Sequence, residues 1–182
     1  MNPTWGDALA CVTRRDAAAL ARLAMGWAGE GRAARPMPRV GQPYGRRVLF
    51  TSPEGEVMLA SWRRGARCAP HDHGEARGLV LVLDGVFTEG VYEATADGGI
   101  RAGSSRVVAA GDTLAVGHGL VHDMRAHGGG ATLHVYVPGV HAMRVYDRDA
   151  RATLLVAGGC GAWVPDEPSH VLRRWDWESA AP

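Results

Sequence analysis

The chain has 182 residues, a length that suits one domain with a sizeable core and leaves little room for two. Its formal net charge is +1, so no basic field points to nucleic acid or to an anionic membrane surface as a partner. All 20 basic residues are arginines, and the lack of lysine excludes both Schiff-base chemistry and a P-loop.

The N-terminal region predicts two short helices within residues 1–31. Thr4 precedes Asp7 by three positions and Thr13 precedes Asp16 by three, which is the spacing of a capping box. The same region has no charged start followed by a clean apolar run, and no stretch of the chain approaches the ~18 apolar residues of a membrane span. We therefore expect a soluble, cytoplasmic protein.

From Tyr44 onward the pattern changes to short apolar runs separated by Gly, Pro, Asp and Ser, which predicts an all-β barrel or sandwich. We expect a single domain over residues 1–182, with the barrel in 44–157 and a tail in 158–182 that packs back onto it. Turns are expected at Asp84-Gly85, Asp97-Gly98-Gly99, Gly111-Asp112 and Gly128-Gly129-Gly130. Candidate strands are Arg47–Thr51, Val57–Trp62, Leu79–Leu83, Val86–Glu93, Ser105–Val108, Thr113–Val116, Thr132–Val137, Met143–Asp147 and Thr153–Val156.

The three cysteines, Cys11, Cys68 and Cys160, are odd in number and far apart, so a disulfide framework is not expected. Cys68 precedes His71 by three residues, so it is a candidate metal ligand. Alternation along a strand puts Cys68 on the opposite face from His71, and this favours a plain buried thiol.

His71 and His73 are two residues apart and would lie on one face of a strand. Neutral imidazole is a common ligand for iron, zinc, copper and nickel, so the pair indicates a metal site. Glu75 shares their parity and could complete a two-histidine, one-carboxylate iron site. Gly74 suggests that the strand bends there, which favours a solvated turn carboxylate instead.

A second cluster, Gly111 to Ala126, makes the chain resemble the cupins, whose fold is a double-stranded β-helix or jelly-roll barrel. The cupin pattern combines a glycine, a His-x-His pair, a glutamate and a second glycine with a later histidine. Gly78 stands where the glutamate ligand belongs, so the resemblance implies a site of three histidines. The positions that match are Gly65, His71, His73 and Gly85 in the first motif, and Gly111, Gly119 and His122 in the second.

Among cupins, this chain is similar to the cysteine dioxygenase and thiol dioxygenase family, bacterial type. Tyr44-Gly-Arg46-Arg47 resembles a segment whose arginine binds the substrate carboxylate, and Thr132-Leu-His134-Val-Tyr136-Val-Pro138 resembles the family's Ser-x-His-x-Tyr-x-Pro segment. Met143–Asp147 resembles a stretch found in bacterial members. Mammalian members join a cysteine to the active-site tyrosine, but the matching position here is Gly78, so that cross-link cannot form.

The resemblance implies an Fe(II) enzyme that oxidises L-cysteine to cysteine sulfinate with O2, with metal ligands His71, His73 and His122. Arg46 would bind the substrate carboxylate, although Arg47 beside it leaves this register open. Thr132, His134 and Tyr136 share a strand face and would form a hydrogen-bonded chain that ends at bound oxygen or substrate. The alternatives are dioxygenation of 3-mercaptopropionate or another small thiol, and a non-catalytic or other-metal cupin. The oligomeric state is left open.

Overall fold

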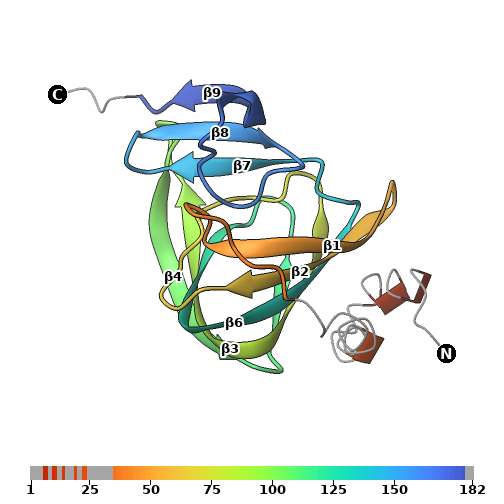
Figure 1. Cartoon of the computed structure of the whole chain (residues 1–182). Helices are drawn as coiled ribbons and strands as arrows, with labels where there is room; N and C mark the ends of the chain where they lie inside the picture. The colour runs from red at the N-terminus through yellow and green to blue at the C-terminus, as the bar shows by residue number, and fades with distance from the viewer. Residues whose placement is uncertain are drawn as a thin grey trace.

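The computed structural model describes residues 35–178 and isolated positions before them, namely residues 6, 7, 10, 11, 14, 19, 22 and 23. The described part is all-β, as expected, and its strands pair antiparallel throughout (Figure 1). The elements are β1 (Tyr44–Ser52), β2 (Gly55–Trp62), β3 (Arg77–Ala94), β4 (Ile100–Ala109), β5 (Thr113–Val116), β6 (Val121–Val137), β7 (Ala142–Asp147), β8 (Ala152–Ala157), the 3-10 turn η1 (Pro168–His170) and β9 (Val171–Asp176).

The two helices expected in residues 1–31 fall mostly outside the described residues, and no α-helix is among the described elements, so that part of the prediction is not supported. The described positions Cys11, Ala19 and Leu23 pack against Val57 and Leu133, on the outer side of the larger sheet. Within the described residues, no helix has the length and apolar character needed to cross a membrane.

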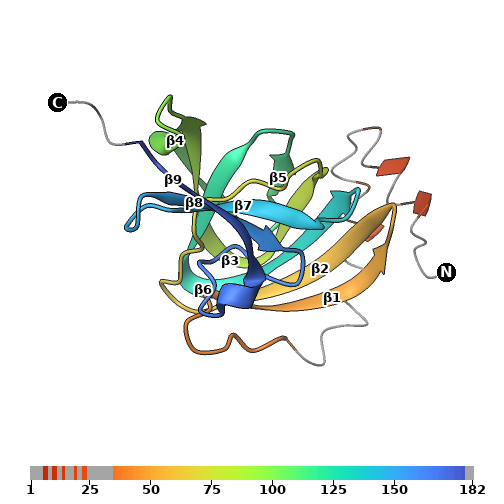
Figure 2. The same cartoon turned by 90° about the horizontal axis from the view of Figure 1, so that it is seen from above.

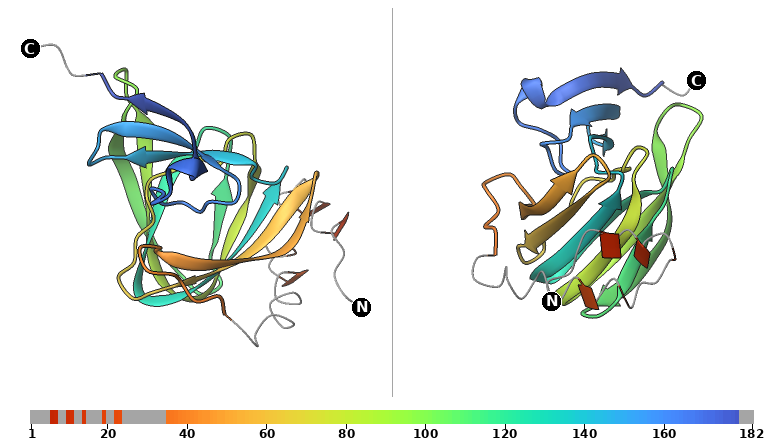
Figure 3. Two further views of the ribbon diagram at one scale, coloured as in Figure 1. Left: turned by 45° about the horizontal axis from the view of Figure 1, so that its top comes forward. Right: turned by 90° about the vertical axis from the view of Figure 1, so that its right-hand side faces the viewer.

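The strands form two groups that enclose the core. The larger sheet has the order β1-β2-β6-β3-β4, with β5 also paired to β3, and the smaller has the order β7-β8-β9. Figures 1 and 2 show the smaller group lying across the open side of the curved larger sheet, and both views in Figure 3 agree. Met143 and Val156 of the smaller group share one buried cluster with Met58 and Val80 of the larger, so the two groups close one interior.

Strand β2 shows why this interior is well defined. Every residue of β2 is buried, because its alternate side chains serve two cores. Met58 and Ala60 point into the barrel interior, and Val57 and Leu59 point into the cluster on the outer face. A one-residue slip of β2 would exchange these faces, so the register is strongly specified.

The predictions of turns at Asp84-Gly85 and at residues 128–130, which were based on glycine-rich sequence, are wrong. Both stretches lie inside long strands and face one another, with Gly85 paired to Gly130 at a point where the register shifts. A Cβ at Gly85 would lie 2.3 Å from the carbonyl oxygen of Gly129, so the backbones approach too closely for a side chain. The glycines therefore permit a bend within β3 and β6 rather than a chain reversal.

Residues 65–73 run between β6 and β7 and connect the two strand groups. The His71 amide donates to the His122 carbonyl oxygen at 2.9 Å, and the His122 amide donates to the His71 carbonyl oxygen at 3.0 Å. On the other edge, the Asp72 amide donates to the Arg144 carbonyl oxygen at 3.0 Å. The segment that carries two of the predicted metal ligands is therefore extended and held on both sides.

The tail packs back onto the barrel, as the sequence predicts. Trp163 lies edge-on to Tyr44, with ring centroids 5.3 Å apart. Trp177 donates through Nε1 to the Thr153 hydroxyl at 2.9 Å. Strand β9 in this tail pairs with β8, and the sequence did not predict this strand.

Candidate metal centre and substrate cavity

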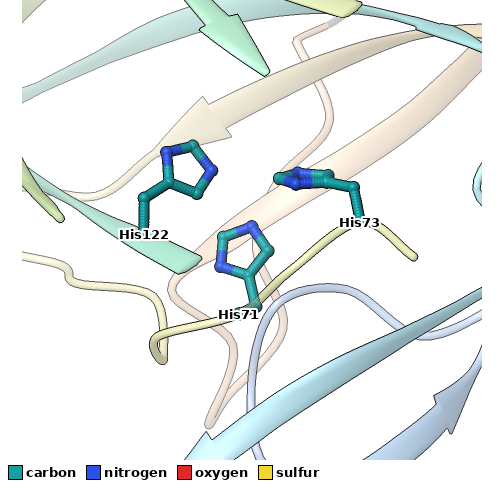
Figure 4. Close-up of side chains that lie close together, drawn as sticks. All are labelled: His71, His73 and His122. Carbon is teal, nitrogen blue, oxygen red and sulfur yellow. The ribbon is translucent and has the colours of Figure 1, made fainter. Parts of the chain in front are cut away.

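Three buried histidines meet at one end of the barrel interior. His71 and His73 come from the 65–73 segment and His122 from β6, and one ring nitrogen from each lies within 4.8 Å of the others. The rings turn toward a common point (Figure 4), with centroids 4.8 to 5.2 Å apart. The structure thus brings together all three histidines that the sequence predicts as ligands.

Hydrogen bonds fix two of these rings from behind. Nδ1 of His71 is 2.9 Å from the Ala69 carbonyl oxygen, and Nδ1 of His122 is 2.8 Å from Oε1 of Glu89. Because each outer nitrogen has a partner, Nε2 of each ring is left to face the centre. Nδ1–H bonded to a carbonyl or carboxylate is the usual support of a metal-binding imidazole.

Glu89 is a functional candidate that the sequence reading missed. It lies on β3, is 1% exposed, and also accepts from Nε of Arg106 at 2.7 Å. Burial opposes its ionisation, but hydrogen bonds from His122 and Arg106 outweigh that effect and lower the pKa of Glu89. The one available signal is its alternation with Phe87, an apolar residue two positions earlier on the same strand.

The chemistry of the three histidines fits a bound metal ion. Burial, followed by the neighbouring imidazoles, holds the pKa of His71 and His73 well below the usual value, so both are neutral as a ligand must be. Nδ1 of His73 is buried and has no hydrogen-bond partner among the described residues. A buried ring nitrogen without a hydrogen-bond partner costs free energy, so the protein alone does not satisfy the polar groups of this ring.

Thr132, His134 and Tyr136 form the hydrogen-bonded chain expected from their shared strand face. The Thr132 hydroxyl is 2.8 Å from Nε2 of His134, and Nδ1 of His134 is 2.8 Å from the Tyr136 hydroxyl. Trp62 donates to the Thr132 oxygen at 2.9 Å, and the Tyr136 hydroxyl is 3.1 Å from Nε2 of His73. The row therefore runs from the core to His73, one of the predicted metal ligands.

These contacts are compatible with one direction for the protons along the row. Trp62 can only donate, so the Thr132 oxygen accepts from it. When the Thr132 proton is directed at Nε2 of His134, the proton of His134 lies on Nδ1, aimed at Tyr136. Burial lowers the pKa of His134 to about 3 and raises that of Tyr136 well above 10.0, so both are neutral. In that arrangement, the Tyr136 proton points toward His73.

Arg46 lines the same cavity, whereas Arg47 is exposed. Most of the Arg46 guanidinium is held by the protein: Nε donates to Met58 Sδ at 3.3 Å, and Nη1 donates to the carbonyl oxygens of Gly158 at 3.1 Å and Cys160 at 2.9 Å. Nη2 lies 3.5 Å from Oε1 of Glu56. In the described contacts, Nη2 is the group that Arg46 can offer to a ligand.

The cavity is small and largely apolar. It measures about 30 Å³, and a buried water needs roughly 10–15 Å³ on this scale, so the site suits a small molecule. Apolar and sulfur-containing walls complete it, contributed by Met58, Trp62, Cys68, Met124, Val140, Met143 and Cys160. Such a site excludes bulky ligands.

Gly78 pairs with Tyr136 across β3 and β6, at the position where a carboxylate ligand would stand in most cupins. A Cβ there would lie 1.8 Å from the Val135 carbonyl oxygen, so this backbone admits no side chain at all. At this position, the strand spacing therefore leaves room neither for a carboxylate ligand nor for a cysteine that could cross-link to the tyrosine.

The remaining candidates lie apart from the centre or serve other roles. Glu75 is exposed and is not in the metal-binding cluster. Asp72 accepts from the Gly74 and Arg144 amides at 3.1 and 2.9 Å, which ties the histidine segment to β7. Cys68 is buried, and burial raises the pKa of its thiol to about 12, so it is inert at neutral pH.

Comparison with solved structures finds several that are similar to this chain in the course of the backbone. An uncharacterised conserved protein with a double-stranded β-helix domain from Klebsiella pneumoniae is 21% identical, and the match covers 63% of this chain and 92% of that chain at a TM-score of 0.49. An RmlC-like cupin from Shewanella frigidimarina (22% identity, 58% and 86% covered, TM-score 0.47) and KdgF from Halomonas sp. (20% identity, 56% and 85% covered, TM-score 0.47) are similar to it at the same level.

Comparison with protein families gives a more specific result. The family described as cysteine dioxygenase type I matches residues 42–149, which is more than half of the chain. The matched span contains the three histidines, Arg46 and the Thr132–Tyr136 row, and it confirms the resemblance drawn from the sequence motifs. The chain belongs to the cysteine dioxygenase type I family.

Proposed function

We propose that this protein is an Fe(II)-dependent thiol dioxygenase that oxidises L-cysteine to cysteine sulfinate with O2. One observation carries the proposal: three buried imidazoles converge in a cavity that also holds an arginine and a hydrogen-bonded tyrosine. Membership of the cysteine dioxygenase type I family supports dioxygenase-type oxidoreductase chemistry with a small thiol as substrate.

His71, His73 and His122 would hold the metal. Bound Fe(II) would supply the redox chemistry that allows O2 to react with the thiol sulfur. Both oxygen atoms end on the sulfur, which loses four electrons as O2 gains four, so no external reductant or organic cofactor is required. The three imidazoles carry no charge, and they therefore leave the full charge of the cation available to lower the pKa of a substrate thiol.

Arg46 and Tyr136 would position the substrate. Nη2 of Arg46 is the donor available for a charge-assisted hydrogen bond to the substrate carboxylate. The Tyr136 hydroxyl, kept protonated by burial, would donate to the substrate or to oxygen from a position fixed by His134 and Thr132. The small apolar cavity would exclude water while these contacts are made.

The test combines metal analysis with O2 uptake. Protein reconstituted with Fe(II) should consume O2 with L-cysteine, and both atoms of isotopically labelled O2 should appear in the sulfinate product. His122→Ala should lose iron and turnover, whereas His127→Ala, an exposed histidine of the same strand, should keep both. A full iron site that gives no uptake with cysteine, 3-mercaptopropionate or cysteamine would overturn the proposal.

A further inference from the structure

Glu56 is a buried carboxylate in the substrate cavity to which the proposed chemistry assigns no role. It is 8% exposed and lines the same cavity as the three histidines. The register of β2 and β6 pairs Glu56 with Tyr136 and Met58 with His134, so Glu56 lies directly beside the tyrosine at the end of the hydrogen-bonded row. A ligand that contacts Tyr136 is therefore within reach of this carboxylate.

The charge of Glu56 is only partly compensated. Burial raises the pKa of Glu56, and the nearby charge of Arg46, then of His141, acts in the opposite direction. The Arg46 contact is 3.5 Å long, whereas a charge-assisted N–H···O hydrogen bond measures about 2.7–2.9 Å. Arg46 is also held by three other acceptors, which prevents it from closing on the carboxylate. Glu56 thus retains capacity to accept a hydrogen bond from a ligand.

The spacing of the two charged groups matches one type of substrate. An α-amino acid carries its carboxylate and its amino group on the same carbon, so a site that contacts both needs a donor and an acceptor side by side. Nη2 of Arg46 and Oε1 of Glu56 are such a pair, 3.5 Å apart in one cavity. A mercapto acid without the amino group would leave Glu56 facing the ligand with no donor, which is costly in a buried site.

We propose that Glu56 accepts a hydrogen bond from the α-amino group of the substrate and selects α-aminothiols over mercapto acids. This inference rests on the proposed thiol site and assigns the contact that discriminates among small thiols. Arg46 alone would bind the carboxylate of either class. Glu56 adds a contact that only the aminothiol can make, and its absence penalises the other class.

The test uses two ligands that differ only in the α-amino group, L-cysteine and 3-mercaptopropionate. Their affinities are measured by calorimetry on Fe(II)-loaded protein without O2, and their kcat/KM values by O2 uptake. In the unmodified protein, cysteine should bind at least about tenfold more tightly. Glu56→Gln should reduce this preference by about tenfold, and Glu56→Met, which lacks the strong acceptor, should reduce it further. Glu54→Gln, at an exposed carboxylate two residues away, should not change it.

The outcomes distinguish the role of Glu56 in binding from the proposed dioxygenase activity. Equal binding of the two ligands to the unmodified protein would overturn it without any variant. An equal loss for both ligands in Glu56→Gln would also overturn it, because Glu56 would then act by holding Arg46 in place. If cysteine binds preferentially through Glu56 but no thiol is oxidised, the inference stands as a binding specificity and the dioxygenase proposal fails.

Discussion

Replacing Glu89 with glutamine tests whether a buried carboxylate supports the metal site. The side chains of Glu89 and His122 are each 2% exposed, and the 2.8 Å contact between them excludes water. The change to an amide keeps the volume, removes the charge, and allows the amide to present N–H to Nδ1 of His122. The His122 ring then loses the acceptor that keeps its other nitrogen free for the metal.

The expected loss can be worked from this geometry. A buried hydrogen bond to a charged group contributes about 1.5–3 kcal/mol, which corresponds to roughly 10- to 100-fold in metal affinity. Losing the support of a ligating histidine typically costs a similar factor. We therefore expect Glu89→Gln to weaken metal binding about 10- to 100-fold.

The assay is competition with a chelator of known affinity, using Co(II) or Fe(II), with thermal unfolding as a check on folding. Glu93→Gln is the matched control, because Glu93 lies on the same strand and its ion pair with Arg101 is exposed. A folded Glu89→Gln protein whose metal affinity stays within about twofold of the unmodified protein would refute the reasoning.

Three further predictions concern the strands around the site. Gly78→Ala should lower the free energy of unfolding by about 3 kcal/mol or more in urea titrations, because its Cβ would lie 1.8 Å from a carbonyl oxygen. Gly117→Ala, where a Cβ would meet no atom within 4 Å, should change the free energy of unfolding little. Equal effects of the two substitutions would contradict the steric argument. Thr132→Val should lower kcat about 10- to 100-fold with a smaller change in KM, whereas Thr88→Val at an exposed hydrogen bond should not; an unchanged kcat would show that the row is not needed. The pKa of His134 is about 3 when folded and about 6.5 when unfolded, so it adds stability above pH ~6.5 that is lost as the pH falls toward 3. His134→Gln should remove up to about 1.4 kcal/mol per pH unit from this slope in unfolding measured across that range, and an unchanged slope would mean that His134 is not buried and neutral.

Much of the site could be predicted from the sequence, because alternation pairs His71 with His73 and the family resemblance supplies the other residues. The three histidines, Arg46, His134 and Tyr136 line one cavity in the structure, and each belongs to a short motif with its spacing intact. Strands such as Val57–Trp62 and Thr113–Val116 were also predicted closely, because apolar runs bounded by turn residues are a local signal.

The features that the sequence did not predict depend on contacts between distant segments. Gly85 and Gly130 looked like turn residues, and only the pairing of β3 with β6 shows that they permit a close crossing. Glu89 and Glu56 belong to no motif. Glu89 contacts His122, which is 33 positions away, and Glu56 contacts Arg46 on a neighbouring strand. Strand register was needed to find both carboxylates.

The extended segment that carries His71 and His73 has a consequence for local motion. Its amides bond to β6 on one edge and to β7 on the other, while two of its side chains and one side chain of β6 would share a single ion. Opening this segment would break those backbone hydrogen bonds and release the ion at the same time. Loading the metal should therefore slow amide hydrogen exchange at His71, Asp72 and His122 by a factor that rises with metal concentration, while β4, which contributes no ligand, exchanges as before.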